Sequence, residues 1–352
     1  MKYHIALTKI NVDRLRTKSD REKTHRSDLL ILAEYLNASL IEQQDYPIKP
    51  LDFIAARCAG TPANWSFARN ISAKLGSDDL VFCPGEEIGI PLAIICGQRK
   101  SRPKIVVWMH RITGLRTRIV LKLFKLDNLI DLFVVSNLTN KQFLKSHLGI
   151  SEARVLFLRH FVDDRYFTPG IGKPKKMRSL IMSVGLEYRD YQLLAKATAD
   201  LDLDVKIAGF SQFQSRTAEY LPKAMPANMS NMKYSWSELI QLYHSADLVV
   251  VCLKPNTAAA GVTVLLEAMC CQKPVICTRT EGLKEYLQDK QAVMTVEPGN
   301  IGELKNAIIY LLEHPDVAKQ MGDYALQLVR KKYNLDSQVK VLGNFIQTLE
   351  NV

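Results

Sequence analysis

Short apolar runs alternate with longer segments of helical periodicity along the whole chain. In the first half, runs that predict strands lie at 2–8, 79–84, 104–110 and 132–137, with weaker candidates at 39–43 and 154–158. In the second half they lie at 179–185, 205–210, 247–253, 274–278 and 292–297. Strands that alternate with helices form parallel sheets covered on both faces, so the pattern predicts an α/β fold.

The segment 161–179, FVDDRYFTPGIGKPKKMRS, separates the two sets of strands and is rich in glycine, proline and lysine. Such a composition is typical of a hinge between domains. A chain of 352 residues with 47% hydrophobic content is long enough to bury two cores. We therefore expect one domain at 1–165 and a second at 166–334.

Nothing in the sequence predicts a membrane span or a signal peptide. No window approaches about eighteen uninterrupted apolar residues, and the first strand runs directly into charged residues. The seven cysteines contain no CxxC pair and sit mostly in apolar strand or helix contexts. We interpret them as reduced core residues of a cytosolic protein rather than as metal ligands or disulfides.

Positive charge is concentrated in the first half of the chain. Residues 1–150 hold 23 basic and 14 acidic side chains, which places +9 of the total net charge of +11 there. The basic residues gather in 9–26 and in 110–126. We therefore expect the first half to face something negative.

The segment 110–126 combines basic and apolar positions. Arg118, Lys122 and Lys125 fall at helical spacing, and Leu123 contributes to the apolar part. Such a helix either lies on an anionic bilayer or packs on its own sheet with a solvated outer face, and the sequence leaves both open. The chain has no RNP, zinc-finger or helix-turn-helix signature, so nucleic acid is not expected as a partner.

The most informative segment is 257–278, TAAAGVTVLLEAMCCQKPVICT, in which small residues and one glycine lead directly into a helix. Without large side chains, the backbone around Ala260 and Gly261 can approach a ligand closely. The first helical N–H groups, near Val262 and Thr263, have no intrahelical acceptors. Such a helix start favours a pyrophosphate.

Glu267 lies one turn beyond Thr263, on the same face of this helix. At that position a carboxylate could accept both hydrogen bonds of a ribose diol. An acidic residue inside an otherwise apolar helix also indicates a function, because carboxylates are rarely buried without a partner. The segment therefore predicts a site for a nucleotide diphosphate.

These residues resemble the donor-site signature of the GT-B glycosyltransferases, specifically the retaining family 4, or glycosyl transferases group 1, whose members often read AGxxVLLEAMAxGKPVIxT. The resemblance continues over 180–197, 204–210, 237–255, 280–287, 296–300 and 331–349. By the order and spacing of these segments, the chain is identified as a member of that family. The first half is similar only loosely.

The resemblance implies two Rossmann-like domains that face a central cleft. Domain 1–165 would bind the acceptor, the helix 335–352 would cross back onto it, and 166–334 would bind the nucleotide-sugar donor. The implied reaction moves a sugar from a nucleotide-diphosphate sugar to an acceptor hydroxyl with retention of configuration. Neither a metal nor a cofactor other than the donor is expected, and the single DLD at 202–204 is explained without metal.

The resemblance also implies roles for residues at strand ends. Gly185 and Arg189 align with the glycine and the basic residue that family members place at the donor phosphates, and Arg189 is expected to be catalytic. His110 is expected to be catalytic on the acceptor side, where Glu87 or its neighbour Glu86 would bind acceptor hydroxyls. The alternatives are a surface arginine at a helix start, a histidine that caps a loop, and glutamates that stabilise a helix N-terminus.

The chain departs from the family pattern in two places. Ala259 stands eight positions before Glu267, where many members carry a first glutamate near the donor sugar. The identity of the sugar, and to a smaller degree the activity, therefore stays open. Gln272 replaces the usual glycine before Lys-Pro, so the helix is expected to end without an easy left-handed cap.

The resulting hypothesis is a metal-independent, hexosyltransferase-type enzyme of polysaccharide, glycolipid or cell-envelope biosynthesis. It is expected in the cytoplasm, either free or peripheral on the inner face of the cytoplasmic membrane, with a saccharide or lipid-linked saccharide as acceptor. Two alternatives remain: a nucleotide-sugar 2-epimerase, and a non-catalytic protein that binds sugar nucleotides or membranes. The sequence leaves the base, sugar, acceptor, linkage and oligomeric state open.

Overall fold

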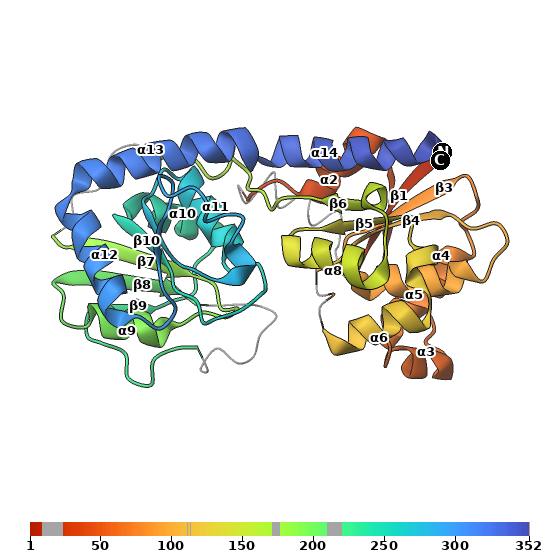
Figure 1. The fold of residues 1–352 in the computed structure, drawn as a ribbon, viewed down its shortest axis with the longest axis horizontal. Coiled ribbons are helices and arrows are strands. Elements are labelled where there is room, and N and C mark those ends of the chain that lie inside the picture. The colour runs from red at the N-terminus through yellow and green to blue at the C-terminus, as the bar shows by residue number, and fades with distance from the viewer. Residues whose placement is uncertain (9–23, 111, 113, 171–176, 210–219, 352) are drawn as a thin grey trace. The chain divides into compact units, whose positions relative to one another are not determined.

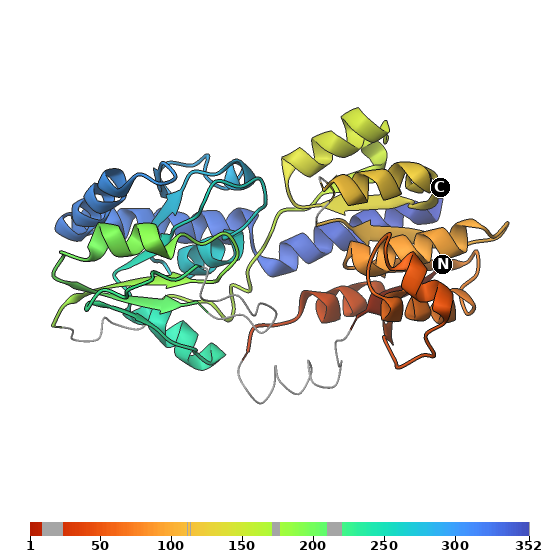
Figure 2. The ribbon, with the colours of Figure 1, turned by 90° about the horizontal axis from the view of Figure 1, so that it is seen from below.

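The computed structural model describes residues 1–8, 24–110, 112, 114–170, 177–209 and 220–351 (Figures 1 and 2). The chain forms two compact units. Unit 1 comprises Met1–Arg21, Arg26–Arg159 and Asp336–Val352, and unit 2 comprises Glu22–His25 and His160–Leu335. Each unit is a parallel six-stranded sheet covered by helices, so the predicted α/β fold is confirmed.

Unit 1 is built on a sheet with the strand order β2-β1-β3-β4-β5-β6. Its strands are β1 (Lys2–Leu7), β2 (Ser39–Glu42), β3 (Asp79–Cys83), β4 (Lys104–Trp108), β5 (Leu132–Val135) and β6 (Val155–Phe157). The central strands β3, β4 and β5 are buried at nearly every position because helices cover both of their faces. All six strands coincide with predicted runs, including the two weaker candidates.

Helices cover both faces of the sheet in unit 1. They are α2 (Asp28–Leu36), α3 (Pro50–Ala55), α4 (Pro62–Ser72), α5 (Glu86–Gly97), α6 (Leu115–Leu123), α7 (Leu126–Leu129), α8 (Leu138–Leu148) and the short η1 (Glu152–Arg154). One core lies between the sheet and the side that carries α4 and α5, where Phe67, Ile88 and Phe133 are fully buried. The other face is covered by α2 and by the C-terminal helix α14 (Figure 1).

The chain ends in α14 (Leu335–Thr348) and η4 (Leu349–Asn351), which belong to unit 1 from Asp336 onward. Val339, Leu342 and Ile346 recur every three or four residues and are buried, which gives α14 one apolar face. Gly343 lies where any side chain would collide with the ring of Tyr35 on α2. The two helices therefore pack in close contact on this face of the sheet.

Unit 2 has the strand order β12-β11-β10-β7-β8-β9. Its strands are β7 (Ser179–Val184), β8 (Leu203–Ala208), β9 (Met229–Asn231), β10 (Leu248–Val251), β11 (Val275–Thr278) and β12 (Met294–Val296). The pattern did not predict β9, whose three residues MSN form no apolar run. The order of the strands reverses between β7 and β10. In such sheets ligands bind beyond the carboxyl ends of the strands at this reversal.

The helices of unit 2 are α9 (Tyr191–Thr198), α10 (Trp236–Ser245), α11 (Val262–Cys270), η3 (Glu281–Leu283), α12 (Ile301–Glu313) and α13 (Pro315–Lys332). Every residue of α11 except Thr263 is buried, which explains its almost wholly apolar sequence. The helix starts directly after the loop that follows β10. It therefore starts at the strand reversal.

The sequence predicted that α11 would end without an easy left-handed cap, because Gln272 replaces the usual glycine, and the structure differs. This residue adopts a φ of +59°, so the helix does end in the left-handed region although the usual glycine is absent. The side-chain amide of Gln272 donates to Asp323 on α13, and Gly322 leaves room for the Gln272 carbonyl. We infer that contacts with α13 hold this backbone conformation without glycine.

No helix in the described parts of the chain is both long enough and apolar enough to span a bilayer. Six of the seven cysteines are buried, and Cys58 is half-buried. Their placement agrees with the predicted role as core residues. Burial raises the pKa of Cys83, Cys252, Cys270 and Cys277, so these thiols are protonated at neutral pH.

Candidate functional site

Gly185 follows β7 and has a φ of +94°, a conformation that favours glycine. A Cβ atom at this position would lie 2.6 Å from Nη2 of Arg189. The guanidinium of Arg189 is therefore folded against the bare backbone of Gly185. The structure brings together the glycine and the basic residue that the family resemblance assigned to the donor phosphates.

Arg189 is held in place by backbone carbonyls. Its Nε donates to the Val184 carbonyl over 2.8 Å, and its Nη1 donates to the Glu187 carbonyl over 3.0 Å. The backbone of Arg189 also pairs with Leu253, in the loop after β10. With 3% of its surface exposed, Arg189 is a buried cation and not a surface arginine.

Gly261 precedes α11 and has a φ of +86°. A Cβ atom on Gly261 would lie 3.4 Å from Nη1 of Arg189 and 2.8 Å from Cγ1 of Val251. The guanidinium of Arg189 thus lies beside two left-handed glycines, Gly185 and Gly261. These glycines come from the two loops that meet at the strand reversal.

The first turn of α11 has free backbone donors. No side chain caps this helix start, and the N–H of Val262 bonds to the Ala259 carbonyl over 3.3 Å. Among the described residues, the N–H groups of Thr263 and Val264 donate no hydrogen bond. The free donors therefore begin at Thr263, next to the buried Ala260 and one residue later than expected.

Glu267 is buried one turn further along α11, with 5% of its surface exposed. Its Oε2 accepts a 2.7 Å hydrogen bond from the hydroxyl of Tyr243 on α10. Burial raises the pKa of the Glu267 carboxyl to about 7, although the hydrogen bond from Tyr243 and the charge of Arg189 both act to lower it. One carboxylate oxygen is thus already engaged within the protein.

The segment after β10 is held close to η3. Gly282 has no room for a side chain because a Cβ atom there would overlap the Ala258 carbonyl, and its N–H donates to the Asn256 carbonyl over 3.3 Å. Ala259 is half-buried and packs on the core of unit 2. These contacts fix the segment that leads into α11.

In unit 1, His110 follows β4 and is exposed. Its backbone N–H donates to Oε2 of Glu86 over 2.9 Å, and its Nε2 lies 3.0 Å from the Pro84 carbonyl, which can only accept. The imidazole stacks on Trp108 with 5.3 Å between ring centroids. The ring is therefore held at the carboxyl ends of β3 and β4.

Glu87 lies at the start of α5, and its Oε1 accepts from the hydroxyl of Thr8 over 3.5 Å. Its carboxylate folds over Gly85, which has no room for a side chain. Glu86, Glu87 and His110 thus lie together at the carboxyl ends of β1, β3 and β4. That edge contains the strand reversal of the first sheet, between β1 and β3.

The sequence interpretation missed Asp28 and Tyr243. Asp28 opens α2, where burial raises the pKa of its carboxyl while the nearby His110 acts to lower it. Nothing in the sequence pairs Asp28 with a histidine 82 positions later. Tyr243 lies within SELIQLYHSADL, where its helical position only predicts burial.

The predicted basic amphipathic helix at 110–126 is shorter in the structure. α6 ends at Leu123, and Lys125 lies beyond it with a φ of +47°. The guanidinium of Arg118 lies 4.6 Å from the centre of the Phe143 ring instead of standing in a row with the lysines. The other basic concentration, 9–26, lies mostly outside the described residues.

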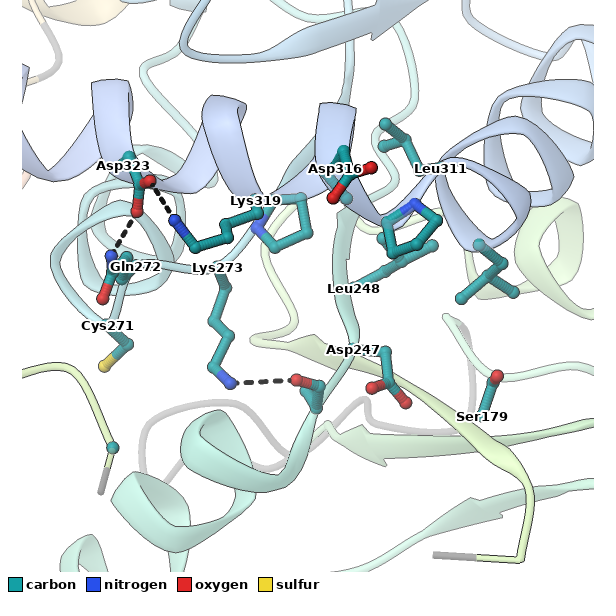
Figure 3. A pocket seen from close by; sticks show the side chains of 16 residues that line it. Ser179, Asp247, Leu248, Cys271, Gln272, Lys273, Leu311, Asp316, Lys319 and Asp323 are labelled. Carbon is teal, nitrogen blue, oxygen red and sulfur yellow. Dashed lines mark hydrogen bonds and ion pairs between the residues drawn. The ribbon is translucent and has the colours of Figure 1, made fainter. Parts of the chain in front are cut away.

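A separate cavity of about 480 Å³ opens in unit 2 at the amino-terminal ends of β7 and β10, away from the start of α11 (Figure 3). Lys273 donates to the carbonyls of His244 and Ala246 there, and Lys319 pairs with Asp323 over 2.8 Å. Its lysines are therefore already engaged within the protein. The cavity lies at the wrong end of the sheet for the predicted donor site.

Comparison with known proteins agrees with this geometry. Residues 169–328 match the model of the family described as glycosyl transferases group 1. This part of the chain is a glycosyl transferases group 1 domain. It carries Gly185, Arg189, Gly261 and Glu267. The predicted resemblance to glycosyl transferases group 1 is thereby confirmed for residues 169–328.

An uncharacterized glycosyltransferase of Methanocaldococcus jannaschii is 29% identical over 202 residues, which is 51% of this chain and 50% of the relative. The chain spans half or less of the length of the curated relatives that it matches.

Solved structures match over the full length. A glycosyltransferase from Rickettsia africae has a TM-score of 0.72 at 15% identity, covering 100% of this chain and 99% of that one. The Anabaena protein HepE in complex with UDP-glucose has a TM-score of 0.68 at 14% identity and covers 100% of both chains. These likenesses establish that the chain has the GT-B fold.

Proposed function

We propose that the protein is a retaining glycosyltransferase that moves a sugar from a nucleotide-diphosphate sugar to an acceptor hydroxyl. The observation that carries this proposal is the buried guanidinium of Arg189 beside Gly185 and Gly261, at the start of α11. A cation, bare backbone and free N–H groups converge there. That combination suits a pyrophosphate.

In the proposed mechanism, the N–H groups of Thr263 and Val264 and the positive end of α11 bind the donor pyrophosphate. Carbonyls take two of the N–H groups of Arg189, and the Tyr191 hydroxyl also lies close to its guanidinium. We propose that the remaining donors bind the phosphates. Charge on the departing diphosphate grows as the glycosidic bond breaks. Fixed donors then stabilise the transition state more than the ground state.

In this mechanism the start of α11 and the guanidinium of Arg189 stabilise the leaving diphosphate. We therefore propose a metal-independent reaction with no cofactor beyond the donor. Glu267 would receive the ribose diol through its carboxylate, with Tyr243 fixing the orientation of that group. The match to HepE, which binds UDP-glucose, supports a nucleotide-diphosphate sugar as donor class.

On the acceptor side, we propose that His110 is the catalytic residue next to the reacting acceptor hydroxyl. Glu87 would bind other hydroxyls of the acceptor. His110 is exposed, and its ring is held by Trp108 and the Pro84 carbonyl, so it is oriented in advance. We propose a saccharide or lipid-linked saccharide as acceptor, in polysaccharide, glycolipid or envelope biosynthesis on the cytoplasmic side. Retention of configuration is carried over from the family resemblance.

The rival functions make different products. A nucleotide-sugar 2-epimerase would convert the sugar without an acceptor, and a non-catalytic binding protein would release no nucleotide. Ala259 removes one carboxylate that many family members place near the donor sugar, which favours a donor whose sugar needs no such contact. The same absence is the strongest argument for a binding protein without activity.

Incubation with a panel of nucleotide-diphosphate sugars tests the proposal. We expect one donor class to raise the unfolding temperature and then to release nucleotide when a saccharide acceptor is present. Stabilisation without nucleotide release across the acceptors tested would favour the binding protein, and conversion to a 2-epimer would favour the epimerase. The anomeric configuration of the product decides between retention and inversion.

A further inference from the structure

α3 is a six-residue helix whose amphipathic pattern is inverted. Its one buried residue is Asp52, whereas Leu51, Phe53 and Ile54 are 72%, 60% and 62% exposed. Ile48, just before the helix, is 46% exposed. A helix that packs on a core normally turns its large apolar side chains inward and its carboxylates outward. We refer to Ile48, Leu51, Phe53 and Ile54 as the α3 patch.

The orientation of α3 is fixed by Asp52. Its Oδ2 accepts a 2.7 Å hydrogen bond from the backbone N–H of Lys49 and a 2.5 Å hydrogen bond from Nη2 of Arg69 on α4. The small residues Ala55 and Ala56 pack on the core of unit 1. The helix is therefore anchored by a paired carboxylate and two alanines, with its large apolar side chains outside.

The segment that leads into α3 is also anchored. Tyr46 stacks on Phe67 with 6.3 Å between ring centroids, and the hydroxyl of Ser66 donates to the Pro47 carbonyl over 2.8 Å. Ile48 is thus presented from a supported segment. The α3 patch is a fixed apolar projection rather than an unanchored loop.

Cations border the α3 patch at both ends. Lys49 and Arg57 are exposed, and neither is in an ion pair with any residue that the structure describes. Asp52 is neutralised by Arg69, which leaves Asp45 as the exposed carboxylate of residues 44–58. A patch with an apolar centre and cationic edges complements an anionic interface.

α6 adds to this surface on the same side of the sheet, opposite α14 (Figure 1). Ile119 and Leu123 are 54% and 69% exposed, and Lys122 and Lys125 are exposed beside them. The side of unit 1 that carries α3 therefore presents separate apolar side chains among lysines and an arginine.

We propose that the α3 patch inserts into the headgroup region of an anionic lipid bilayer, with Lys49 and Arg57 on the lipid phosphates. Exposed apolar side chains can be buried at the boundary between headgroups and acyl chains, and basic residues add attraction to anionic lipid. The inserting element is thus α3, and Lys122 of α6 adds positive charge at the edge together with Lys125, which follows that helix. This inference concerns membrane docking and is independent of the proposed donor chemistry.

Sedimentation of the full chain with vesicles tests the proposal. With equal parts phosphatidylglycerol and phosphatidylcholine at about 0.1 M salt, where the screening length is about 10 Å, wild-type protein should sediment. The double variant Leu51→Ser/Phe53→Ser should bind about tenfold more weakly, since two inserted side chains are removed. The matched control Met177→Ser/Met232→Ser, which alters exposed apolar residues of unit 2, should bind as wild type.

Three results would overturn the proposal: wild-type protein in the supernatant, unchanged binding of Leu51→Ser/Phe53→Ser, or loss of binding only in Ile119→Ser/Leu123→Ser. A concentration-dependent dimer that Leu51→Ser/Phe53→Ser abolishes, without vesicle binding, would instead make the patch an interface between copies. Unfolding temperatures check that the variants fold. Lys49→Glu/Arg57→Glu provides a second test, because it should lower binding to the anionic vesicles while the α3 patch stays intact.

Discussion

The hydroxyl of Tyr243 donates a 2.7 Å hydrogen bond to Oε2 of Glu267, and both side chains are buried. The bond joins α10 to α11 directly behind the helix start that we assign to the donor pyrophosphate. Burial raises the pKa of Glu267 to about 7, so the carboxyl titrates near neutral pH. The proposed ribose contact should therefore depend on pH and on Tyr243.

Tyr243→Phe should weaken donor binding near pH 7 and less so at higher pH. The hydroxyl stabilises the carboxylate, so its removal raises the pKa of Glu267 and protonates the group that accepts the ribose hydroxyls. A hydrogen bond to a charged group contributes about 1.5 kcal/mol, which corresponds to about tenfold in the donor KM. The measurement is donor KM from pH 6 to 9.

Tyr286→Phe is the matched control. The hydroxyl of this buried tyrosine accepts a hydrogen bond from the backbone N–H of His160, whereas that of Tyr243 donates to Glu267. It should leave the pH dependence of donor KM unchanged. If Tyr243→Phe also gave the wild-type pH profile, Tyr243 would serve packing alone.

The raised pKa of Glu267 also predicts how stability changes with pH. Between about pH 4.5 and 7 the folded state keeps a proton that the unfolded state has lost, so stability falls as pH rises through this window. Glu267→Gln removes this effect. The free energy of unfolding of wild type should fall by about 3 kcal/mol relative to Glu267→Gln across the window.

Urea unfolding at pH 4.5, 6 and 7.5 measures this difference. As pH rises from 4.5 to 7.5, the free energy of unfolding of Glu267→Gln should increase relative to that of wild type. Parallel stability curves for the two proteins would show that Glu267 is not buried as a titrating group.

Gly261→Ala should lower both stability and donor binding. The left-handed backbone costs about 1 to 2 kcal/mol for a residue with a Cβ atom. The added methyl would also lie 2.8 Å from Val251 and 3.4 Å from Nη1 of Arg189, which displaces the guanidinium or the loop.

Gly299→Ala separates these two effects. Gly299 has a φ of +75°, and nothing lies within 4 Å of where its Cβ atom would be. It should show the backbone cost alone, measured as free energy of unfolding, with donor KM unchanged. Equal donor KM in Gly261→Ala and wild type would remove the α11 start from the donor site.

The sequence predicted the strands well because nearly all of them are buried and apolar. The exception is β9, which is three residues long and has one buried side chain. α6 ended before Lys125 because that residue adopts a left-handed conformation and opens α7 instead, a local choice that charge spacing does not reveal.

Those residues of the candidate site that lie within one sequence motif could be predicted. Those that packing brings together from distant parts of the chain could not. Gly261 and Glu267 follow from one segment, and the family resemblance added Arg189. The partners Tyr243 and Asp28 come from other helices, and only the fold shows which residues they meet. The exposed Leu51, Phe53 and Ile54 have a composition typical of a core helix, so their outward direction also required the structure.

Nucleotide release by Arg189→Lys is the most direct test of the central claim, that a buried guanidinium at the start of α11 stabilises the departing diphosphate. Lysine keeps the charge but loses the planar fork, and loss of one such stabilising group costs about 100-fold in kcat. The control is Arg279→Lys, which changes an exposed arginine paired with Glu297 in the same unit. We predict a kcat reduced about 100-fold in Arg189→Lys and a wild-type kcat in Arg279→Lys. A wild-type kcat in a folded Arg189→Lys would contradict the account.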